Sequence, residues 1–176
     1  MLGDGFEEIE ALAVVDVARR ANIETFMVSV SSDLQVSSTR GIRVIADKQL
    51  TKVTVEPDDA IVIPGGKGIQ VLNENSLVKE LIIKHRSHKG LIAAICAGPM
   101  LPGNLGLLEG IKATCFPGYE QYLKGAVVVD EDVVTDQNCV TARGAGVSLA
   151  FAYAIIEVIK GREEADKLKS VMQYRR

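Results

Sequence analysis

The chain has 176 residues, a length that fits one domain of ordinary size. Hydrophobic residues make up 47% of it and charged residues 24%, a balance that is typical of a folded domain with an apolar core and argues against disorder. The net charge is −3 and the basic residues are scattered along the chain, so we expect no nucleic-acid partner.

Helical and strand-like patterns alternate along the chain. Residues 7–21 carry an apolar stripe at helical spacing, which includes Ile9 and Val17, with acids in the first turn and arginines in the last, and they predict a helix. Strands are predicted at 23–31, 58–63, 91–95, 111–115 and 138–142, a hairpin over 126–135, and further helices at 74–88, 147–160 and 162–172. This alternation predicts a single α/β domain, 1–176, with a mostly parallel sheet and helices on both faces.

The first predicted helix has no strand before it. In this architecture such a helix follows a strand, yet only Met1 and Leu2 precede the loop at 3–5. We therefore expect that the first strand of the fold is missing at the N-terminus and that the natural sequence starts earlier.

Sequence signals for export and for membrane insertion are absent. The chain begins without the basic region and apolar run of a signal peptide, and no uncharged apolar stretch approaches about 18 residues. The three cysteines (Cys96, Cys115 and Cys139) cannot all pair with one another, and none has a C-x-x-C or C-x-x-H spacing. We expect a cytoplasmic protein with at least one free thiol, no membrane partner, no metal and no cofactor.

Five unusual loops meet at one edge of the predicted sheet. In open α/β sheets, ligands bind at the carboxyl ends of the strands. The loops that reach this edge are residues 3–5, 64–68, 96–99, 116–118 and 143–146. We expect the functional site there.

Cys96 lies at the centre of this edge. A strand, one residue, then Ala97-Gly98 and a helix is the arrangement of a nucleophile elbow, in which small residues let the helix pack closely while the nucleophile stays exposed. The start of a helix would lower the pKa of the thiol into a range of roughly 3.5–7.5. The alternative, an inert cysteine at the end of a core strand, stays open.

Gly65 and Gly66 directly follow a predicted strand. Two glycines there allow backbone N–H groups to approach a ligand oxygen, so the pair is a candidate oxyanion hole; a plain tight turn is the alternative. The residues around Lys67 lack the spacing of a phosphate-binding loop.

The partner of Cys96 must be an acid rather than a histidine. His85 and His88 precede the strand that Cys96 follows, so they lie at its opposite end, and we expect both to be solvated on a surface helix. Of Glu7, Glu8 and Glu10, two should face water. Glu10 shares the side of the apolar residues and is predicted to turn inward, where a protonated carboxyl would donate a hydrogen bond to the Cys96 sulfur.

Several motifs together resemble those of a known family. They are G-F-E-E-I-E at 5–10, S-S-T-R-G at 37–41, V-I-P-G-G at 62–66, A-A-I-C-A-G-P at 93–99 and A-R-G-A-G at 142–146. With these motifs the chain resembles the ThiJ/PfpI superfamily, in the branch of the Parkinson-disease protein deglycase and its bacterial relative YajL. The resemblance covers essentially the whole chain after the missing strand.

The resemblance implies a flavodoxin-like sandwich that forms a homodimer, with the first helix and the segment around Arg40 at its interface. It implies that Cys96 is an oxidation-sensitive nucleophile, that Glu10 is a protonated glutamate, and that Gly65, Gly66 and Ala97 supply backbone donors. Arg40 matches an arginine that approaches the pocket, often across the dimer interface. The remaining residues expected around the pocket are Cys115, Phe116, Pro117, Arg143 and Gly144.

One departure from the family affects the predicted chemistry. Many relatives place a histidine near the active cysteine, but the matching stretch reads Thr114-Cys115-Phe116-Pro117, which disfavours a peptidase. A cysteine-dependent glyoxalase or deglycase remains, with a small reactive carbonyl such as methylglyoxal, or its protein adducts, as substrate. The alternative is an oxidative-stress sensor or redox-regulated chaperone, in which Cys96 is oxidised to a sulfinic acid without turnover.

Overall fold

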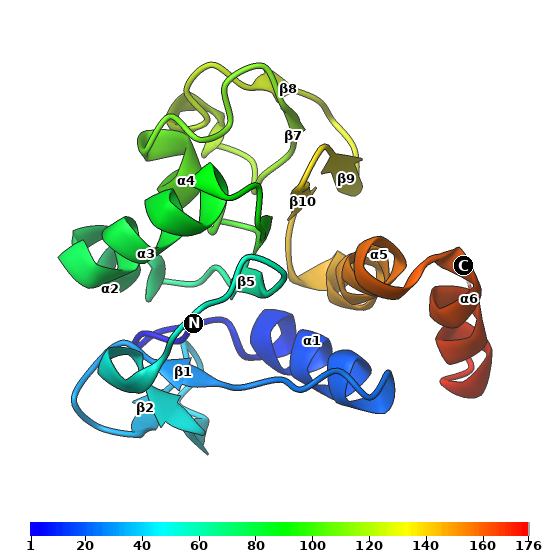
Figure 1. Ribbon diagram of the computed structural model, residues 1–176, viewed down its shortest axis with the longest axis horizontal. Helices are drawn as coiled ribbons and strands as arrows, with labels where there is room; N and C mark the ends of the chain where they lie inside the picture. Colours follow the sequence, from blue (N-terminus) through cyan, green and yellow to red (C-terminus); the bar gives the residue numbers. More distant parts are fainter. Residues whose placement is uncertain (176) are drawn as a thin grey trace.

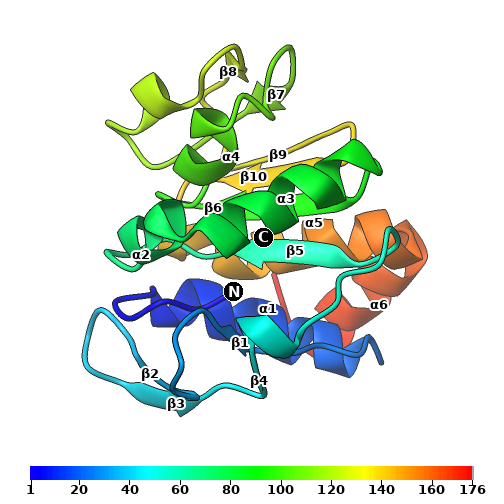
Figure 2. The ribbon, with the colours of Figure 1, turned by 60° about the vertical axis from the view of Figure 1, so that its left-hand side comes forward.

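The computed structural model describes residues 1–175 and shows a sheet with helices on both faces (Figures 1 and 2). The central sheet has the order β5-β6-β10-β9 and consists of β5 (Ala60–Ile63), β6 (Leu91–Ile95), β10 (Cys139–Ala142) and β9 (Val133–Asp136). Strands β5, β6 and β10 are parallel, and β9 is antiparallel to β10. The predicted mostly parallel α/β sandwich is thus confirmed.

The two faces of β6 belong to two separate halves of the core. Ile92 and Ala94 pack with α2 (Ile69–Glu74), α3 (Ser76–Ser87) and α4 (Met100–Asn104), whereas Leu91, Ala93 and Ile95 pack with α1 (Glu8–Arg20), α5 (Ser148–Lys160) and α6 (Arg162–Val171). Burial on both faces explains the unbroken apolar run of this strand, since each fully buried Ile contributes about 1.5–3 kcal/mol. No helix within residues 1–175 is both long and apolar enough to cross a membrane.

Short strand pairs surround the central sheet. They are β1 (Val28–Ser29) with β4 (Lys48–Gln49), β2 (Gln35–Ser37) with β3 (Arg43–Ile45), and β7 (Lys112–Ala113) with β8 (Val127–Val128). Short 3-10 helices lie at Leu50–Lys52, Glu120–Tyr122 and Ala145–Val147. The predicted hairpin over 126–135 is wrong: β8 pairs in parallel with β7, and β9 forms its hairpin with β10 instead. The turn of that hairpin is made by Gln137, which has a positive φ of 50°.

Met1 and Leu2 lie between β1 and β5. The Leu2 N–H donates to the Val28 carbonyl at 2.7 Å, and the Met1 amino group donates to the Val62 carbonyl at 2.8 Å. Leu2 also forms a parallel bridge with Ser29. These two residues lead directly into the loop that begins α1, and that the first strand of the fold is missing stays a prediction.

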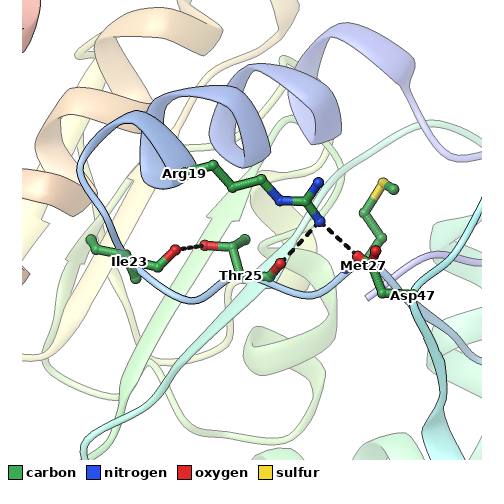
Figure 3. Close-up of polar contacts among 5 residues, drawn as sticks. All are labelled: Arg19, Ile23, Thr25, Met27 and Asp47. Carbon is green, nitrogen blue, oxygen red and sulfur yellow. Dashed lines mark hydrogen bonds and ion pairs between the residues drawn. The ribbon is translucent and has the colours of Figure 1, made fainter.

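The C-terminal end of α1 is tied to the segment that leads into β1 (Figure 3). Arg19 Nη2 donates to the Thr25 carbonyl at 3.1 Å and to Asp47 Oδ2 at 2.8 Å, and Asp47 Oδ2 also accepts the Met27 N–H at 2.6 Å. The Thr25 hydroxyl donates to the Ile23 carbonyl at 2.9 Å. Because the Arg19–Asp47 pair is partly exposed, it contributes about 0–1 kcal/mol. Its main effect is to fix the path of the chain.

Candidate functional site

Cys96 sits on a strained turn at the carboxyl end of β6. Its φ of 62° is in the left-handed region, which is rare for a residue other than glycine. Two hydrogen bonds hold this conformation: the Cys96 N–H donates to the Ala142 carbonyl at 2.8 Å, and the Cys96 carbonyl accepts the Phe116 N–H at 2.9 Å. The predicted strained turn is confirmed, but α4 begins only at Met100 and has five residues, so it is a weaker dipole than the sequence pattern indicated.

Glu10 is fully buried beside this turn. One carboxyl oxygen, Oε2, accepts the Gly65 N–H at 2.7 Å, whereas Oε1 has no hydrogen-bond partner among the described residues. Glu7 helps to position it, because Glu7 Oε2 accepts the Glu10 N–H at 2.8 Å and so caps α1. Since a buried carboxyl oxygen without a partner is costly, the arrangement favours a proton on Glu10 or a donor supplied by a ligand.

The turn after β5 brings its backbone into contact with the side chains of Cys96 and Glu10. A Cβ atom on Gly65 would lie 2.8 Å from Cys96 Cβ and 2.9 Å from Glu10 Oε2, so only glycine fits there. Gly66 has a φ of 83°. The N–H groups of Gly66 and Ala97 act on the Cys96 sulfur and favour its charged form. Of the glycine pair, the Gly65 N–H already donates to Glu10, so the oxyanion hole stays a prediction that rests on the N–H groups of Gly66 and Ala97.

The thiol and the carboxyl lie close enough to perturb each other's pKa values. Burial raises the pKa of Glu10 from 4.5 to about 7, against the opposing hydrogen bond from Gly65. Burial, and next the neighbouring Glu10 charge, raise the pKa of Cys96 from 9.0 to about 12. The predicted lowering of the thiol pKa is therefore wrong, because two backbone donors do not offset burial beside a carboxylate. The pair loses its first proton near pH 7 and its second near pH 12.

The residues predicted around the pocket lie at different depths. Phe116 and Pro117 are exposed, and the Phe116 ring lies 3.4 Å from where a Cβ on Gly144 would be. Arg143 turns toward Asp130 and Asp132, at 3.4 and 3.7 Å, and Arg40 is exposed, with no hydrogen bond or ion pair from its side chain to Cys96 within residues 1–175. The structure therefore brings Phe116 and Gly144 to the edge of the site, whereas the Arg143 side chain is directed to two acids instead.

Cys115 lies on the other side of the sheet from the Cys96 side chain. It is buried in the half of the core that contains α2, α3 and α4, whereas Cys96 packs against the half that contains α1 and α5. Burial, followed by the nearby Glu120, raises the pKa of Cys115 to about 11. Cys115 is thus a poor partner for a disulfide with Cys96.

Three expectations about side-chain exposure are wrong. Glu8 is buried, so only Glu7 of the three acids is partly solvated, and Ile9 is 57% exposed although its spacing placed it on the inward stripe. His85 is buried, with Nε2 3.2 Å from the Leu91 carbonyl, because its ring packs directly against Gly90, where any Cβ would collide with it. Helix periodicity alone could not identify these exceptions, since each depends on what a neighbouring element covers.

Two hollows of the surface lie away from Cys96. One, of about 870 Å³, lies between β9, α5 and α6, and a smaller one, of about 240 Å³, lies beside Ile9 and the start of α5. Within residues 1–175, no group of three or more His, Cys, Asp or Glu side chains is arranged to hold a metal ion. The chemistry available at the site is that of a partly exposed thiol, a buried carboxyl and backbone donors.

Comparisons with known proteins agree with this arrangement. The chain is 35% identical over 178 residues to Protein DJ-1 homolog A of Arabidopsis thaliana, covering 99% of this chain but only 45% of that protein. It is 31% identical to the glutathione-independent glyoxalase DJR-1.2 of Caenorhabditis elegans, covering 92% of this chain and 87% of the relative. The solved structure of oxidized Toxoplasma gondii DJ-1 matches with a TM-score of 0.93 at 31% identity, covering 98% and 95% of the two chains.

The fold and the family follow from these matches. The likeness in structure confirms the predicted flavodoxin-like fold. The DJ-1/PfpI family model matches residues 1–158, which include every element that contributes to the site. The chain belongs to the DJ-1/PfpI family.

Proposed function

We propose that this protein is a cysteine-dependent enzyme that acts on small reactive carbonyls such as methylglyoxal, or on their protein adducts, without glutathione. The observation that carries the proposal is Glu10: a fully buried carboxyl with one oxygen fixed by Gly65 and the other unpartnered beside a cysteine on a strained turn. A carboxyl whose pKa is raised to about 7 can both accept and return a proton at neutral pH. The similarity to a named glutathione-independent glyoxalase supports the same chemistry.

The reaction can be written with only the groups present. Cys96 passes its proton to Glu10, and the thiolate adds to the aldehyde carbon to form a hemithioacetal, whose oxygen faces the N–H groups of Gly66 and Ala97. Glu10 returns the thiol proton to this oxygen, then removes the hydrogen on the same carbon as a proton and delivers it to the adjacent carbonyl carbon, while the hydroxyl proton passes to the oxygen of the former ketone. The aldehyde carbon is thereby oxidised and the ketone carbon reduced, which leaves a lactoyl thioester on Cys96. Water hydrolyses the thioester and releases lactate and the thiol.

The first test is methylglyoxal consumption in the absence of glutathione. We expect the wild type to consume it, Cys96→Ser to lose activity, and Glu10→Gln to lose most of it, because an amide cannot accept the thiol proton. Cys139→Ala is the matched control, since Cys139 is buried at the start of β10. Full activity in Cys96→Ser would refute the proposal.

A second candidate function is oxidation sensing through the same thiol. It is favoured by one specific observation: Cys115 lies on the opposite face of the sheet, so no described cysteine is placed to form a disulfide with an oxidised Cys96. Without such a partner, a sulfenic acid proceeds to the sulfinic acid. A relative was solved in an oxidized form. Such a protein would react once with its modifier and would not turn over.

A further inference from the structure

The turn that contains Gly66 follows β5, but residues from other segments of the chain also pack against it. A Cβ on Gly66 would lie 2.5 Å from the Gly5 carbonyl oxygen, 2.7 Å from the Glu7 N–H nitrogen and 2.8 Å from Thr39 Oγ1. Two segments far apart in sequence, the loop at 5–7 and the segment that contains Thr39, therefore close around this one residue. The same turn lies against Cys96, since a Cβ on Gly65 would be 2.8 Å from Cys96 Cβ, and the Gly66 N–H is, with that of Ala97, one of the two backbone donors that favour the thiolate.

Thr39 connects its own segment to the loop before α1 by two hydrogen bonds. Its hydroxyl donates to the Gly5 carbonyl at 2.5 Å, and its N–H donates to the Phe6 carbonyl at 2.8 Å. The Gly5 carbonyl also accepts the Gly68 N–H at 2.9 Å, which fixes the far end of the same turn. The Gly5 carbonyl thus accepts hydrogen bonds from both the Thr39 hydroxyl and the Gly68 N–H of the turn that Thr39 contacts.

We propose that Thr39 is a positioning residue of the candidate site: its hydroxyl, bonded to the Gly5 carbonyl and packed on Gly66, aims the Gly66 N–H at the Cys96 sulfur. Thr39 itself has no contact with the reacting atoms and acts only through the Gly66 turn. The inference deepens the proposed function and rests on it for the effect on turnover. Its effect on the reactivity of the thiol can be measured whether or not the protein is an enzyme.

The distinguishing variants are Thr39→Val, which keeps the shape and removes the hydroxyl, and Thr39→Ser, which keeps the hydroxyl. Thr25→Val is the matched control, because the Thr25 hydroxyl also donates to a backbone carbonyl but lies just after the C-terminal end of α1 (Figure 3), whereas the site lies beside Glu10 at the start of this helix. The readouts are the rate of Cys96 alkylation by iodoacetamide across pH and the kcat and KM for methylglyoxal.

Removing a donor of this kind outright costs about 10²–10³ in kcat, so misaiming one should cost on the order of tenfold. We expect Thr39→Val to slow alkylation, to move its pH midpoint upward and to lower kcat more than it raises KM. Thr39→Ser should restore all three, and Thr25→Val should match the wild type. Wild-type alkylation in Thr39→Val, or a defect of equal size in Thr39→Ser, would overturn the inference. If the wild type shows no turnover, the proposed function fails and alkylation alone decides the role of Thr39.

Discussion

Replacing Glu10 by glutamine should stabilise the fold, and more so as pH rises. The Glu10 carboxyl is fully buried, and its pKa is raised to about 7 from the ordinary value of 4.5 that it would have in the unfolded chain. Between these two pH values the folded protein keeps a proton that the unfolded chain has released. The stability contribution of this group is therefore complete below pH 4.5 and is lost as pH rises through 7.

The size of the effect follows from the gap between the two pKa values. From 4.5 to about 7 is about 2.5 pH units, and each unit corresponds to about 1.4 kcal/mol, so ionisation of Glu10 costs the fold about 3 kcal/mol. Glutamine stays neutral in both states. The difference in unfolding free energy between Glu10→Gln and the wild type should grow by about this amount across the window and stay level above it.

Urea unfolding of both proteins at a series of pH values across this window measures the difference directly. Glu24→Gln serves as the control, because Glu24 is exposed and its replacement should leave stability nearly unchanged. A difference between Glu10→Gln and the wild type that is flat across the window, or that shrinks as pH rises, would show that the buried carboxyl is not held in its protonated form.

Three further predictions concern the surroundings of the site. Mild peroxide should convert Cys96 to the sulfinic acid before either buried cysteine reacts, because Cys96 alone is partly exposed; a Cys96–Cys115 disulfide as the main product in peptide mass spectrometry would contradict this. The chain should form a homodimer through α1, so Ile9→Asp, at a position 57% exposed, should reduce the mass seen by light scattering to that of a monomer; a wild-type monomer at micromolar concentration would rule this out. Gly65→Ala should abolish carbonyl turnover and cost about 1–3 kcal/mol of stability, while Gly146→Ala, with open space at its Cβ, should do neither.

Much of the framework could be predicted from the sequence. Continuous apolar runs and their flanking glycines located β5, β6 and β10, and the rule that ligands bind at the carboxyl ends of parallel strands led to Cys96 and Gly65. The inward turn of Glu10 followed from its spacing along α1. These inferences depend on local periodicity and chain direction, which one sequence contains.

The predictions that were wrong concern features that depend on what packs against each element. Whether β8 pairs with β9 or with β7 is decided by a neighbouring strand, not by its own residues. The burial of His85 follows from its contact with Gly90, and the high pKa of Cys96 follows from the depth of the site. Thr39 lies in the S-S-T-R-G motif, but the motif does not show what the Thr39 hydroxyl contacts, so its role emerges only when the loop at 3–5 and the turn at 65–68 are seen together.

The most direct test of the central claim is a count of turnovers. Wild-type protein is mixed with a large excess of methylglyoxal without glutathione, and the lactate released is divided by the amount of protein. If Cys96 and Glu10 act as a nucleophile and a proton carrier, the wild type should release many equivalents of lactate, and Cys96→Ser and Glu10→Gln should release little or none. Release of no lactate, or loss of one equivalent of methylglyoxal with Cys96 left permanently modified, would contradict the account and leave oxidation sensing as the function of this thiol.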